Sequence, residues 1–433
     1  MKITRYAALG VAASLVLAAC GSDSDDSTEP EAKKDADGKT IVTMWVAGDD
    51  TSDELRDWLK ENFEEEHEDA VLEIEEQDWN GLVPKLQTAL ASGDQTPDLV
   101  EVGNTQAPLF THAGAFEDLS DVYEDLGGDK LLPEFVKQGT VDDTVFSVPY
   151  YSGARAVFYN EEMFDEAGVE VPETIDEFAE VAEKLQEEFP NASGIEFPGQ
   201  DWYNGIAWIF TAGGEIAVEN GDEWEGALSS PESLEGLEQL SEIFATSTQS
   251  PADSDSAEPW IPFNEGDAAM FSAPTWARWS IDLEECATDD EDDWDQECNE
   301  GKTSIFPLPG NSAGEPAPVF AGGSNIGVGS KSPNKDLAKD LLRLIYSEEY
   351  QTQLAEAGMI PGNTDYADAL GDDEYSQAAI DAALNAKLTP PAPKWADVEA
   401  ERIMEDFFQK IASGEDPAKA AEETDELLNA TLN

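Results

Sequence analysis

Basic residues are scarce in this sequence. The 433-residue chain has 23 Lys and Arg against 96 Asp and Glu, which gives a formal net charge of −73 at pH 7. A chain this acidic repels nucleic acid and anionic lipid, so neither is an expected partner. Disordered acidic chains also lack aromatic residues, whereas this one has 18 Phe and 11 Trp. The sequence therefore predicts a packed protein whose excess of acid keeps its surface solvated.

Histidine is rarer still, with only His67 and His112 in the whole sequence. Neither has a cysteine or a second histidine at the spacing of a metal site. Ser-His-Asp and Cys-His catalysis also need a histidine next to a nucleophile, and neither position suggests one. The sequence therefore predicts no metal site, no cofactor and no catalytic residue.

Cysteine occurs three times in the sequence. Cys286 and Cys298 share a hydrophilic stretch, 285–302, which we interpret as an acidic surface insertion. In an exported protein such a pair predicts a disulfide that closes a small loop.

Apolar runs long enough to cross a membrane are missing after the first twenty residues. Lys2 and Arg5 precede an apolar stretch at 7–19, which ends in the letters LAACG at 17–21. That ending resembles the bacterial lipobox, in which the cysteine becomes the lipidated N-terminus. We therefore expect a signal peptide at 1–19, a lipid on Cys20, and a disordered tether at 20–39 that holds the protein at the extracytoplasmic face of the cell membrane. The lipid would be the only contact with the membrane.

Strands and helices alternate in the sequence from about residue 40. Apolar runs at 41–46, 71–74 and 98–102 predict strands, and the stretches 52–63 and 82–91 predict helices. Such alternation is typical of a mainly parallel sheet with helices on both faces. Roughly 390 residues follow the tether, which is too many for one simple core. An α/β protein with two lobes is therefore expected.

Several stretches resemble the extracellular solute-binding family that includes maltose-binding protein, and one loop is similar to its chitobiose-type actinobacterial branch. They occur in the family's order and are PDLVEVGNTQ at 97–106, AGAFEDL at 113–119, VPYY at 148–151, FYNEEMF at 158–164, GDAAM at 266–270, APTW at 273–276, GGSN at 322–325 and SPNK at 332–335.

The resemblance implies two α/β lobes joined by a hinge, with a ligand cleft between them. Lobe 1 would hold 40–150 and about 303–330, and lobe 2 about 151–302 and 331–433. It also implies a monomer that is not an enzyme, binds a sugar, usually an oligosaccharide, and delivers it to the permease of an ABC transporter.

Sugar sites combine aromatic planes for the ring faces with polar groups for the hydroxyls. On the resemblance, Trp276 occupies the stacking position with Arg278 beside it, although the extra Thr275 shifts the register. The candidates that follow strands, where open α/β sheets bind ligands, are Asp49, Asp50, Trp79, Asn104, Thr105 and Gln106, and those at the first crossing between lobes are Tyr151 and Ser152. The resemblance places an acid and aromatic residues of the cleft at Asp201, Trp202 and Tyr203. A further candidate is Trp395, which opens a late helix after a proline-rich stretch.

Two other functions remain open at this stage. A surface glycoside hydrolase needs a pair of carboxyl groups at a set separation, and among 96 acids such a pair can occur by chance. Alternatively the same binding fold could hold a polyamine in an acidic cleft.

Overall fold

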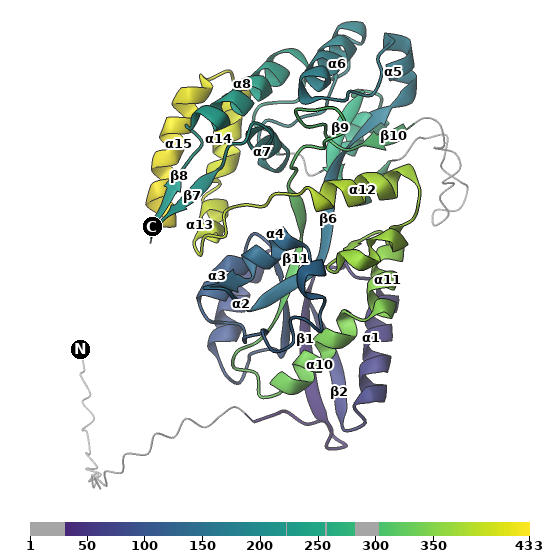
Figure 1. Ribbon diagram of the computed structural model, residues 1–433, viewed down its shortest axis with the longest axis vertical. Helices are drawn as coiled ribbons and strands as arrows, with labels where there is room; N and C mark the ends of the chain where they lie inside the picture. The colour runs from purple at the N-terminus through teal and green to yellow at the C-terminus, as the bar shows by residue number, and fades with distance from the viewer. Residues whose placement is uncertain (1–30, 222, 256–257, 282–302) are drawn as a thin grey trace, which may run out of the picture.

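The computed structural model has two lobes stacked along the long axis of the molecule (Figure 1). It describes residues 31–221, 223–255, 258–281 and 303–433. The signal peptide, Cys20, the acidic insertion and the pair Cys286 and Cys298 lie outside the described residues. Within those residues, no helix has both the length and the apolar character needed to cross a membrane.

The last part of the predicted tether is ordered as a turn. Asp35 accepts hydrogen bonds from the backbone N–H groups of Asp37 (2.9 Å) and Lys39 (2.8 Å), and Lys34 forms an isolated bridge with Thr40. The expectation of disorder up to residue 39 overlooked this side-chain capping, because composition alone does not reveal it.

The lower lobe in Figure 1 is built on a mixed sheet. Strand β1 (Thr40–Ala47) lies parallel to β2 (Ala70–Gln77) and to β3 (Leu99–Gly103), and β11 (Ala321–Val328) lies antiparallel to β3. Alternate residues of β1 face opposite sides of the sheet. Val42, Met44 and Val46 pack with α1, α10 and α11, whereas Ala47 packs with α2 and α3.

Helices cover both faces of this sheet (Figure 1). Helix α1 begins after Ser52, whose hydroxyl accepts a hydrogen bond from the Leu55 N–H, as the sequence predicts. Beyond α3 a short hairpin leads toward the second lobe. The elements are α1 (Asp53–Glu66), α2 (Leu82–Ala91), α3 (Ala107–His112), η1 (Gly128–Lys130), α4 (Pro133–Gln138), β4 (Thr140–Val141), β5 (Thr144–Val145), α10 (Lys335–Ile345) and α11 (Glu348–Glu356).

One long strand runs from the lower lobe into the upper lobe (Figure 1). β6 (Ser147–Asn160) pairs with β11 and β12 (Ile360–Pro361) near its start and with β9 and β10 near its end. Ser152 and Gly153 interrupt the apolar pattern in the middle of β6. The β11 partner bridges that interruption, with a register shift between Ser324 and Asn325.

The upper lobe surrounds the far half of β6 with helices (Figure 1). Its core contains Phe178, Trp208, Leu237 and Phe408, all fully buried. The elements are α5 (Glu161–Ala167), α6 (Ile175–Glu188), α7 (Trp202–Thr211), β7 (Ala217–Asn220), β8 (Glu223–Gly226), α8 (Pro231–Thr246), α9 (Trp260–Asn264), β9 (Met270–Pro274), η2 (Thr275–Ser280), β10 (Thr303–Phe306), α12 (Glu374–Leu384), α13 (Trp395–Ala400), α14 (Ile403–Ala412) and α15 (Pro417–Leu432). Before α12, η5 (Thr364–Leu370) packs against α11 of the lower lobe, where the Thr364 hydroxyl donates to Lys130 O (2.9 Å).

The lobe boundaries differ from those expected in two places. Helices α10 and α11 pack in the lower lobe, where Leu341 and Leu354 join the cluster around Val42. Strand β10 belongs to the upper lobe, where Ile305 packs with Phe158. Both assignments depend on contacts across more than 100 residues, which the spacing of apolar residues does not encode.

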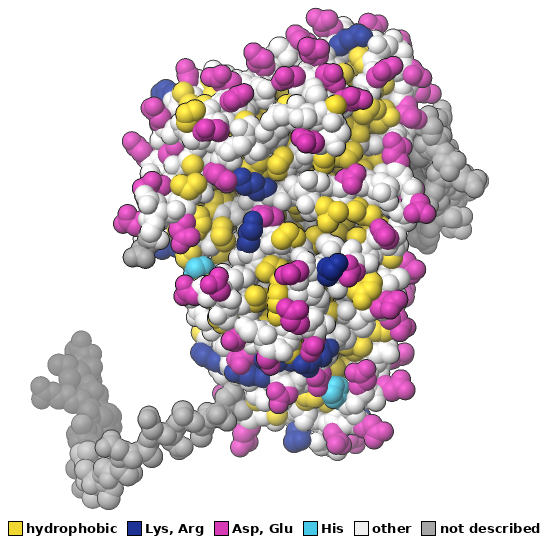
Figure 2. All heavy atoms as spheres, viewed as in Figure 1, with side chains coloured by type: hydrophobic (Ala, Val, Ile, Leu, Met, Phe, Trp, Pro, Cys, Tyr) yellow, Lys and Arg dark blue, Asp and Glu magenta, His cyan; other side chains and the backbone are white. Residues whose placement is uncertain are grey.

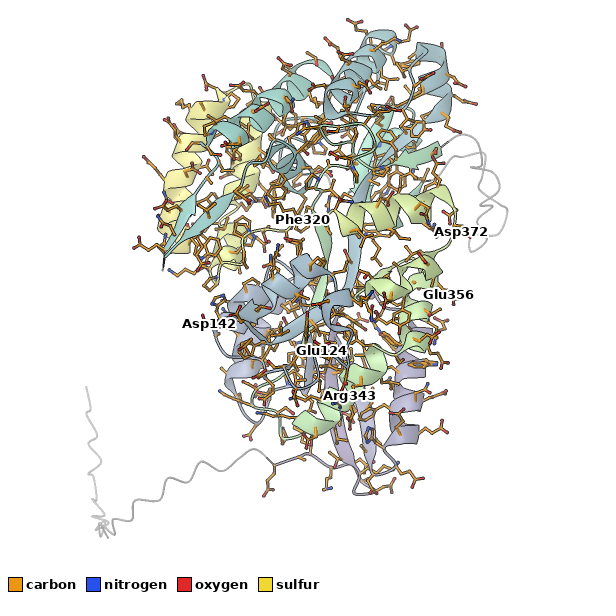
Figure 3. All side chains as sticks on the ribbon, viewed as in Figure 1. Glu124, Asp142, Phe320, Arg343, Glu356 and Asp372 are labelled. Carbon is orange, nitrogen blue, oxygen red and sulfur yellow. The ribbon has the colours of Figure 1, made fainter. Side chains whose placement is uncertain are left out.

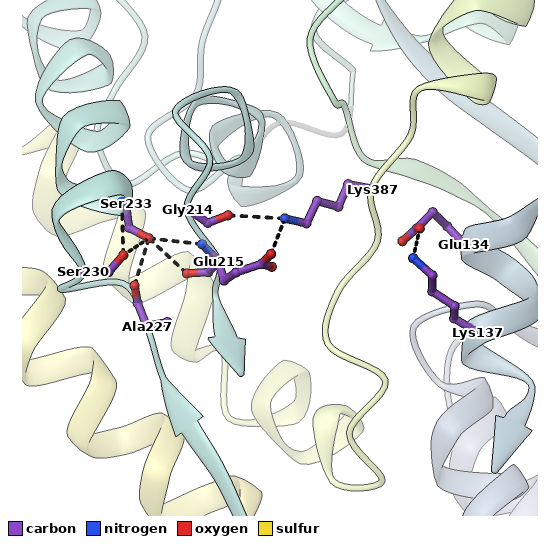
Figure 4. A network of polar contacts seen from close by, with 8 residues as sticks. All are labelled: Glu134, Lys137, Gly214, Glu215, Ala227, Ser230, Ser233 and Lys387. Carbon is purple, nitrogen blue, oxygen red and sulfur yellow. Dashed lines mark hydrogen bonds and ion pairs between the residues drawn. The ribbon is translucent and has the colours of Figure 1, made fainter. Parts of the chain in front are cut away.

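Residues 385–394 run between the lobes after α12. Lys387 donates from Nζ to Glu215 Oε1 (2.7 Å) and to Gly214 O (3.3 Å), which ties this segment to the upper lobe (Figure 4). From the lower lobe, Gln138 Nε2 on α4 donates to Thr389 O (2.7 Å). The segment therefore has polar anchors on both sides.

Candidate ligand-binding site

A pocket of about 390 Å³ opens in the upper lobe on the side that faces the lower one. Its lining comes from β6, α7, α9, β9, the start of η2 and α14, together with neighbouring loops. The lining residues are Arg155, Gln200, Asp201, Trp202, Tyr203, Asn204, Asp255, Pro259, Trp260, Ser272, Ala273, Pro274, Trp276 and Glu405.

Trp276 forms an exposed aromatic wall of this pocket. It has 47% of its surface exposed, and its ring meets Trp260 edge to face at a centroid distance of 5.7 Å. Gly153 leaves room beside it, since a Cβ there would lie 3.4 Å from Trp276 Cδ1. A half-exposed indole in the lining of a pocket suits stacking against an apolar ring.

Aromatic side chains also form the inner part of the pocket. Trp202 and Tyr203 stack at a centroid distance of 4.0 Å, and Tyr203 lies 4.9 Å from Phe320. Phe320 comes from the approach to β11 and lies where the two lobes meet (Figure 3). The Arg155 guanidinium lies 5.1 Å from the Tyr203 ring and 5.6 Å from the Phe320 ring.

Arg155 and Asp201 are the buried charges of this pocket. Burial lowers the pKa of Arg155, and the charge of Asp201 counteracts that effect. Burial likewise raises the pKa of Asp201, with the Arg155 charge and hydrogen bonds from Asn204 acting against it. Asn204 donates to Asp201 from its backbone N (3.2 Å) and from Nδ2 (2.6 Å), which also caps α7. The pair is thus fixed by the helix start and by the aromatic rings.

Two buried polar atoms in this pocket lack a partner among the described residues. They are Arg155 Nε, a donor, and Glu405 Oε2, an acceptor. Buried polar groups are normally hydrogen-bonded. The pocket therefore has polar capacity that a ligand or water would satisfy.

A second aromatic group lies at the carboxyl edge of the lower-lobe sheet. Trp79, 38% exposed, donates from Nε1 to Asp50 Oδ2 (3.2 Å). Its ring lies over Gly48 and Gly103, where an added Cβ would come within 2.8 Å and 3.4 Å of the indole. Gln106 Oε1, next to Gly103, is buried without a partner among the described residues.

Tyr151 links this group to the hinge strand. Its hydroxyl lies 2.7 Å from Asp50 Oδ2 and 2.8 Å from Glu101 Oε1. Asp49, in contrast, is exposed and acts on the group only through its charge.

The other candidates occupy structural positions. Asn104 is buried and donates from Nδ2 to Ala321 O (2.7 Å), and the Ser152 hydroxyl donates to Gly322 O (3.3 Å), so both hold the β11 crossing. Arg278 lines a separate small cavity near Tyr375, and its charge lowers the pKa of Asp373. Trp395 is fully buried in the upper-lobe core.

Glu399 connects the two lobes at one side. This α13 residue accepts a hydrogen bond from Trp395 Nε1 (3.2 Å) and others from the side chains of Thr105 and Gln106 in the lower lobe. Burial raises the pKa of Glu399 to about 7, despite these hydrogen bonds.

Of the residues predicted from the sequence, Asp201, Trp202, Tyr203 and Trp276 line one pocket in the structure, together with neighbours that were not predicted. Residues not anticipated are Glu101, Arg155, Asn204, Asp255, Trp260, Glu399 and Glu405. Arg155 carried a usable signal, because it is a single cation inside an otherwise apolar strand in a chain poor in basic residues. Among the residues that the structure describes, no group of three or more His, Cys, Asp or Glu side chains is placed to hold a metal ion.

Known proteins share this sequence pattern and architecture. A family model for bacterial extracellular solute-binding proteins matches residues 58–383. The diacetylchitobiose binding protein DasA of Streptomyces coelicolor is 32% identical over 438 residues, covering 100% of this chain and 99% of that protein. An arabinooligosaccharide-binding protein of Halalkalibacterium halodurans is 25% identical, covering 71% and 67% of the two chains.

Solved structures show the same fold at lower identity. The sugar-binding protein MalE from Xanthomonas citri superposes with a TM-score of 0.79 at 21% identity, covering 91% of this chain and 97% of that one. The GacH receptor of Streptomyces glaucescens gives a TM-score of 0.73 at 20% identity, covering 90% and 98%.

Proposed function

Because the chain belongs to the bacterial extracellular solute-binding protein family, we propose that it captures a sugar in the pocket of the upper lobe for uptake by an ABC transporter. The observation that carries this proposal is the combination of a half-exposed Trp276 with the partnerless atoms Arg155 Nε and Glu405 Oε2. A sugar ring offers an apolar face that can stack on Trp276 and hydroxyl groups that can hydrogen-bond to Arg155 Nε and Glu405 Oε2. Binding without turnover is the expected activity.

The ligand class that we infer is an N-acetylated disaccharide such as diacetylchitobiose. The name of the full-length Streptomyces relative supports this class. An acetamido group offers both a carbonyl oxygen, which could accept from Arg155 Nε, and an N–H, which could donate to Glu405 Oε2. Trp276 and Tyr203 would stack on the pyranose rings.

Calorimetry with a small panel of ligands tests this function. Diacetylchitobiose should bind more tightly than cellobiose, which has hydroxyls in place of the acetamido groups, and more tightly than an arabino-oligosaccharide. Spermidine tests the polyamine alternative, and chromatography after long incubation tests the hydrolase alternative. Release of more product than protein, or tight binding of spermidine alone, would contradict a sugar-binding role.

The anchor and the partners belong to the same proposal. A lipid on Cys20 would hold the protein outside the membrane, where a monomer delivers sugar to a permease, and a disulfide between Cys286 and Cys298 would close the acidic insertion. Mass spectrometry of the protein purified from membranes tests both modifications. Loss of membrane association in a Cys20→Ala variant is the expected result.

A further inference from the structure

Three side chains form a hydrogen-bonded chain at the carboxyl edge of the lower-lobe sheet. Asp50 follows β1, Glu101 lies within β3, and Tyr151 lies in β6. The Tyr151 Oη atom is 2.7 Å from Asp50 Oδ2 and 2.8 Å from Glu101 Oε1. The Ser324 hydroxyl donates to Tyr151 Oη at 3.3 Å.

Counting hydrogens shows that this arrangement needs one more proton than the phenol supplies. A phenol has a single O–H, so it can donate to only one of two carboxylates. Both contacts have the length of an O–H···O hydrogen bond. One of the two carboxyl groups must therefore carry a proton and donate it to Tyr151 Oη.

The surroundings identify Glu101 as the protonated group. Asp50 Oδ2 already accepts from Trp79 Nε1 (3.2 Å), which suits a carboxylate. Glu101 has only 2% of its surface exposed, and its Oε2 accepts from the Ala47 N–H (2.9 Å). A neutral acid fits this site, since one oxygen accepts from the backbone while the other donates to the phenol.

We propose that Glu101 is a neutral carboxylic acid that acts through Tyr151 to position the Asp50 carboxylate for a sugar hydroxyl. The proposal rests on the sugar-binding function, and Glu101 and Tyr151 are positioning residues in it. Among the described residues none donates to Asp50 Oδ1, so that oxygen is available to a ligand. Trp79, held on the same carboxylate, would place its ring beside that ligand.

The charged and titratable neighbours are consistent with this assignment. Burial and the Asp50 charge raise the pKa of Glu101 to about 7, although its hydrogen bonds oppose them. Burial raises the pKa of Tyr150, Tyr151 and Tyr350, so these phenols keep their hydrogens. Burial raises the pKa of Asp50 as well, but there the hydrogen bonds from Tyr151 and Trp79 act against it. Of the neighbouring charges, Asp49 raises the pKa of Asp50 and Arg56 lowers it.

Ionisation of Glu101 would disturb the ligand-facing group. The Asp50 and Glu101 carboxylates would then compete for the hydrogen of Tyr151 Oη. Asp50 would lose the Tyr151 hydrogen bond part of the time and keep only the one from Trp79. Sugar affinity should therefore be constant at pH values below about 7 and fall as the pH rises through it. The decrease is at most about tenfold per pH unit for one proton linked to binding.

Glu101→Gln tests the neutral form of this side chain, because glutamine has a hydrogen to donate and cannot ionise. Glutamine reproduces the neutral acid, because its carbonyl can accept from the Ala47 N–H and its amide can donate to Tyr151 Oη. We expect Glu101→Gln to bind diacetylchitobiose like the wild type at pH 6, but without the decrease between pH 6 and pH 9. Glu101→Ala should bind weakly at every pH. Glu73→Gln, which removes one exposed charge from strand β2 of the same sheet, is the matched control and should keep the wild-type profile.

A second measurement does not depend on the sugar. The pKa of Glu101 is raised in the folded protein, so ionising it destabilises the fold, and the stability present at low pH is lost as the pH rises from about 4.5 through about 7. Over that range the unfolding equilibrium constant of the wild type relative to Glu101→Gln should rise on the order of a hundredfold.

The two measurements distinguish failure of this inference from failure of the proposed function. Parallel pH profiles of wild type and Glu101→Gln in both assays would overturn the neutral acid. If the stability profiles diverge while the panel of sugars fails to bind, the proton assignment is supported and the sugar-binding role is contradicted. If sugar binds with the same pH profile in both proteins, the positioning role is overturned.

Discussion

Replacement of Trp276 by alanine should weaken sugar binding while leaving the fold intact. The ring is 47% exposed, and its aromatic contact is with Trp260 at 5.7 Å, so little core packing is lost. Loss of one stacking ring costs about 1–3 kcal/mol, by analogy with aromatic stacking on nucleic-acid bases. The dissociation constant for diacetylchitobiose should therefore rise about 5- to 150-fold.

Trp395→Ala provides the matched comparison. This tryptophan was also a candidate from the sequence, but it is fully buried and packs 6.1 Å from Trp202. Its removal leaves a core cavity that should cost about 3–5 kcal/mol of unfolding free energy. Calorimetric titration and thermal unfolding of both variants separate the two effects. An unchanged dissociation constant for Trp276→Ala, at an unchanged melting temperature, would refute the stacking role.

Three further predictions concern charge. Asp201→Asn preserves the cap of α7 but removes the negative charge that favours the charged form of the buried Arg155, so urea unfolding should show a lower free energy of unfolding. An unchanged free energy of unfolding would mean that the Asp201 charge does not stabilise Arg155. Burial raises the pKa of Glu399 to about 7, so the stability that this residue contributes is present below about pH 4.5 and is lost as the pH rises from about 4.5 through 7. Thermal unfolding should therefore show the melting temperature of the wild type falling relative to that of Glu399→Gln between pH 5 and pH 8, and parallel profiles would contradict this. The net charge of −73 should destabilise the fold by self-repulsion, and salt screens that repulsion because the Debye length falls from about 10 Å at 0.1 M to about 3 Å at 1 M. The melting temperature should therefore rise between low salt and about 1 M salt. A melting temperature that does not change with salt would show that self-repulsion contributes little.

The sequence predicted the fold class and much of the lower lobe because those signals are local. Ser52 was recognisable as a helix cap, and the apolar run at 41–46 lies within β1. Helices α13 and α14 are separated by Arg402, which adopts a left-handed conformation (φ 56°) between them. Glycine or asparagine is the usual residue in a left-handed conformation, so an arginine at this position gives no signal of a helix break in the sequence.

The candidate site was harder to predict because its members come from distant parts of the chain. Trp276 and Tyr203 were identified from motifs, but Glu405 contributes to the same pocket from more than 120 residues away. Glu101 was hidden for a different reason. It lies inside a strand that reads as an ordinary buried segment, and its proton becomes evident only when the distances to Tyr151 and Asp50 are known together.

The overall charge of the chain is a poor guide to its ligand. Acidic side chains are spread over both lobes on the face shown in Figure 2, where they contact solvent. Inside the pocket, in contrast, the acids lie next to cations, because Asp201 is beside Arg155 and Asp255 Oδ2 is 3.1 Å from Arg402 Nη2. A polycation would gain attraction from the outer surface but would meet the Arg155 guanidinium in the pocket lining. Arg155 Nε needs an acceptor and Glu405 Oε2 needs a donor, so a neutral ligand that offers both satisfies the pocket better than an amine, which offers donors alone.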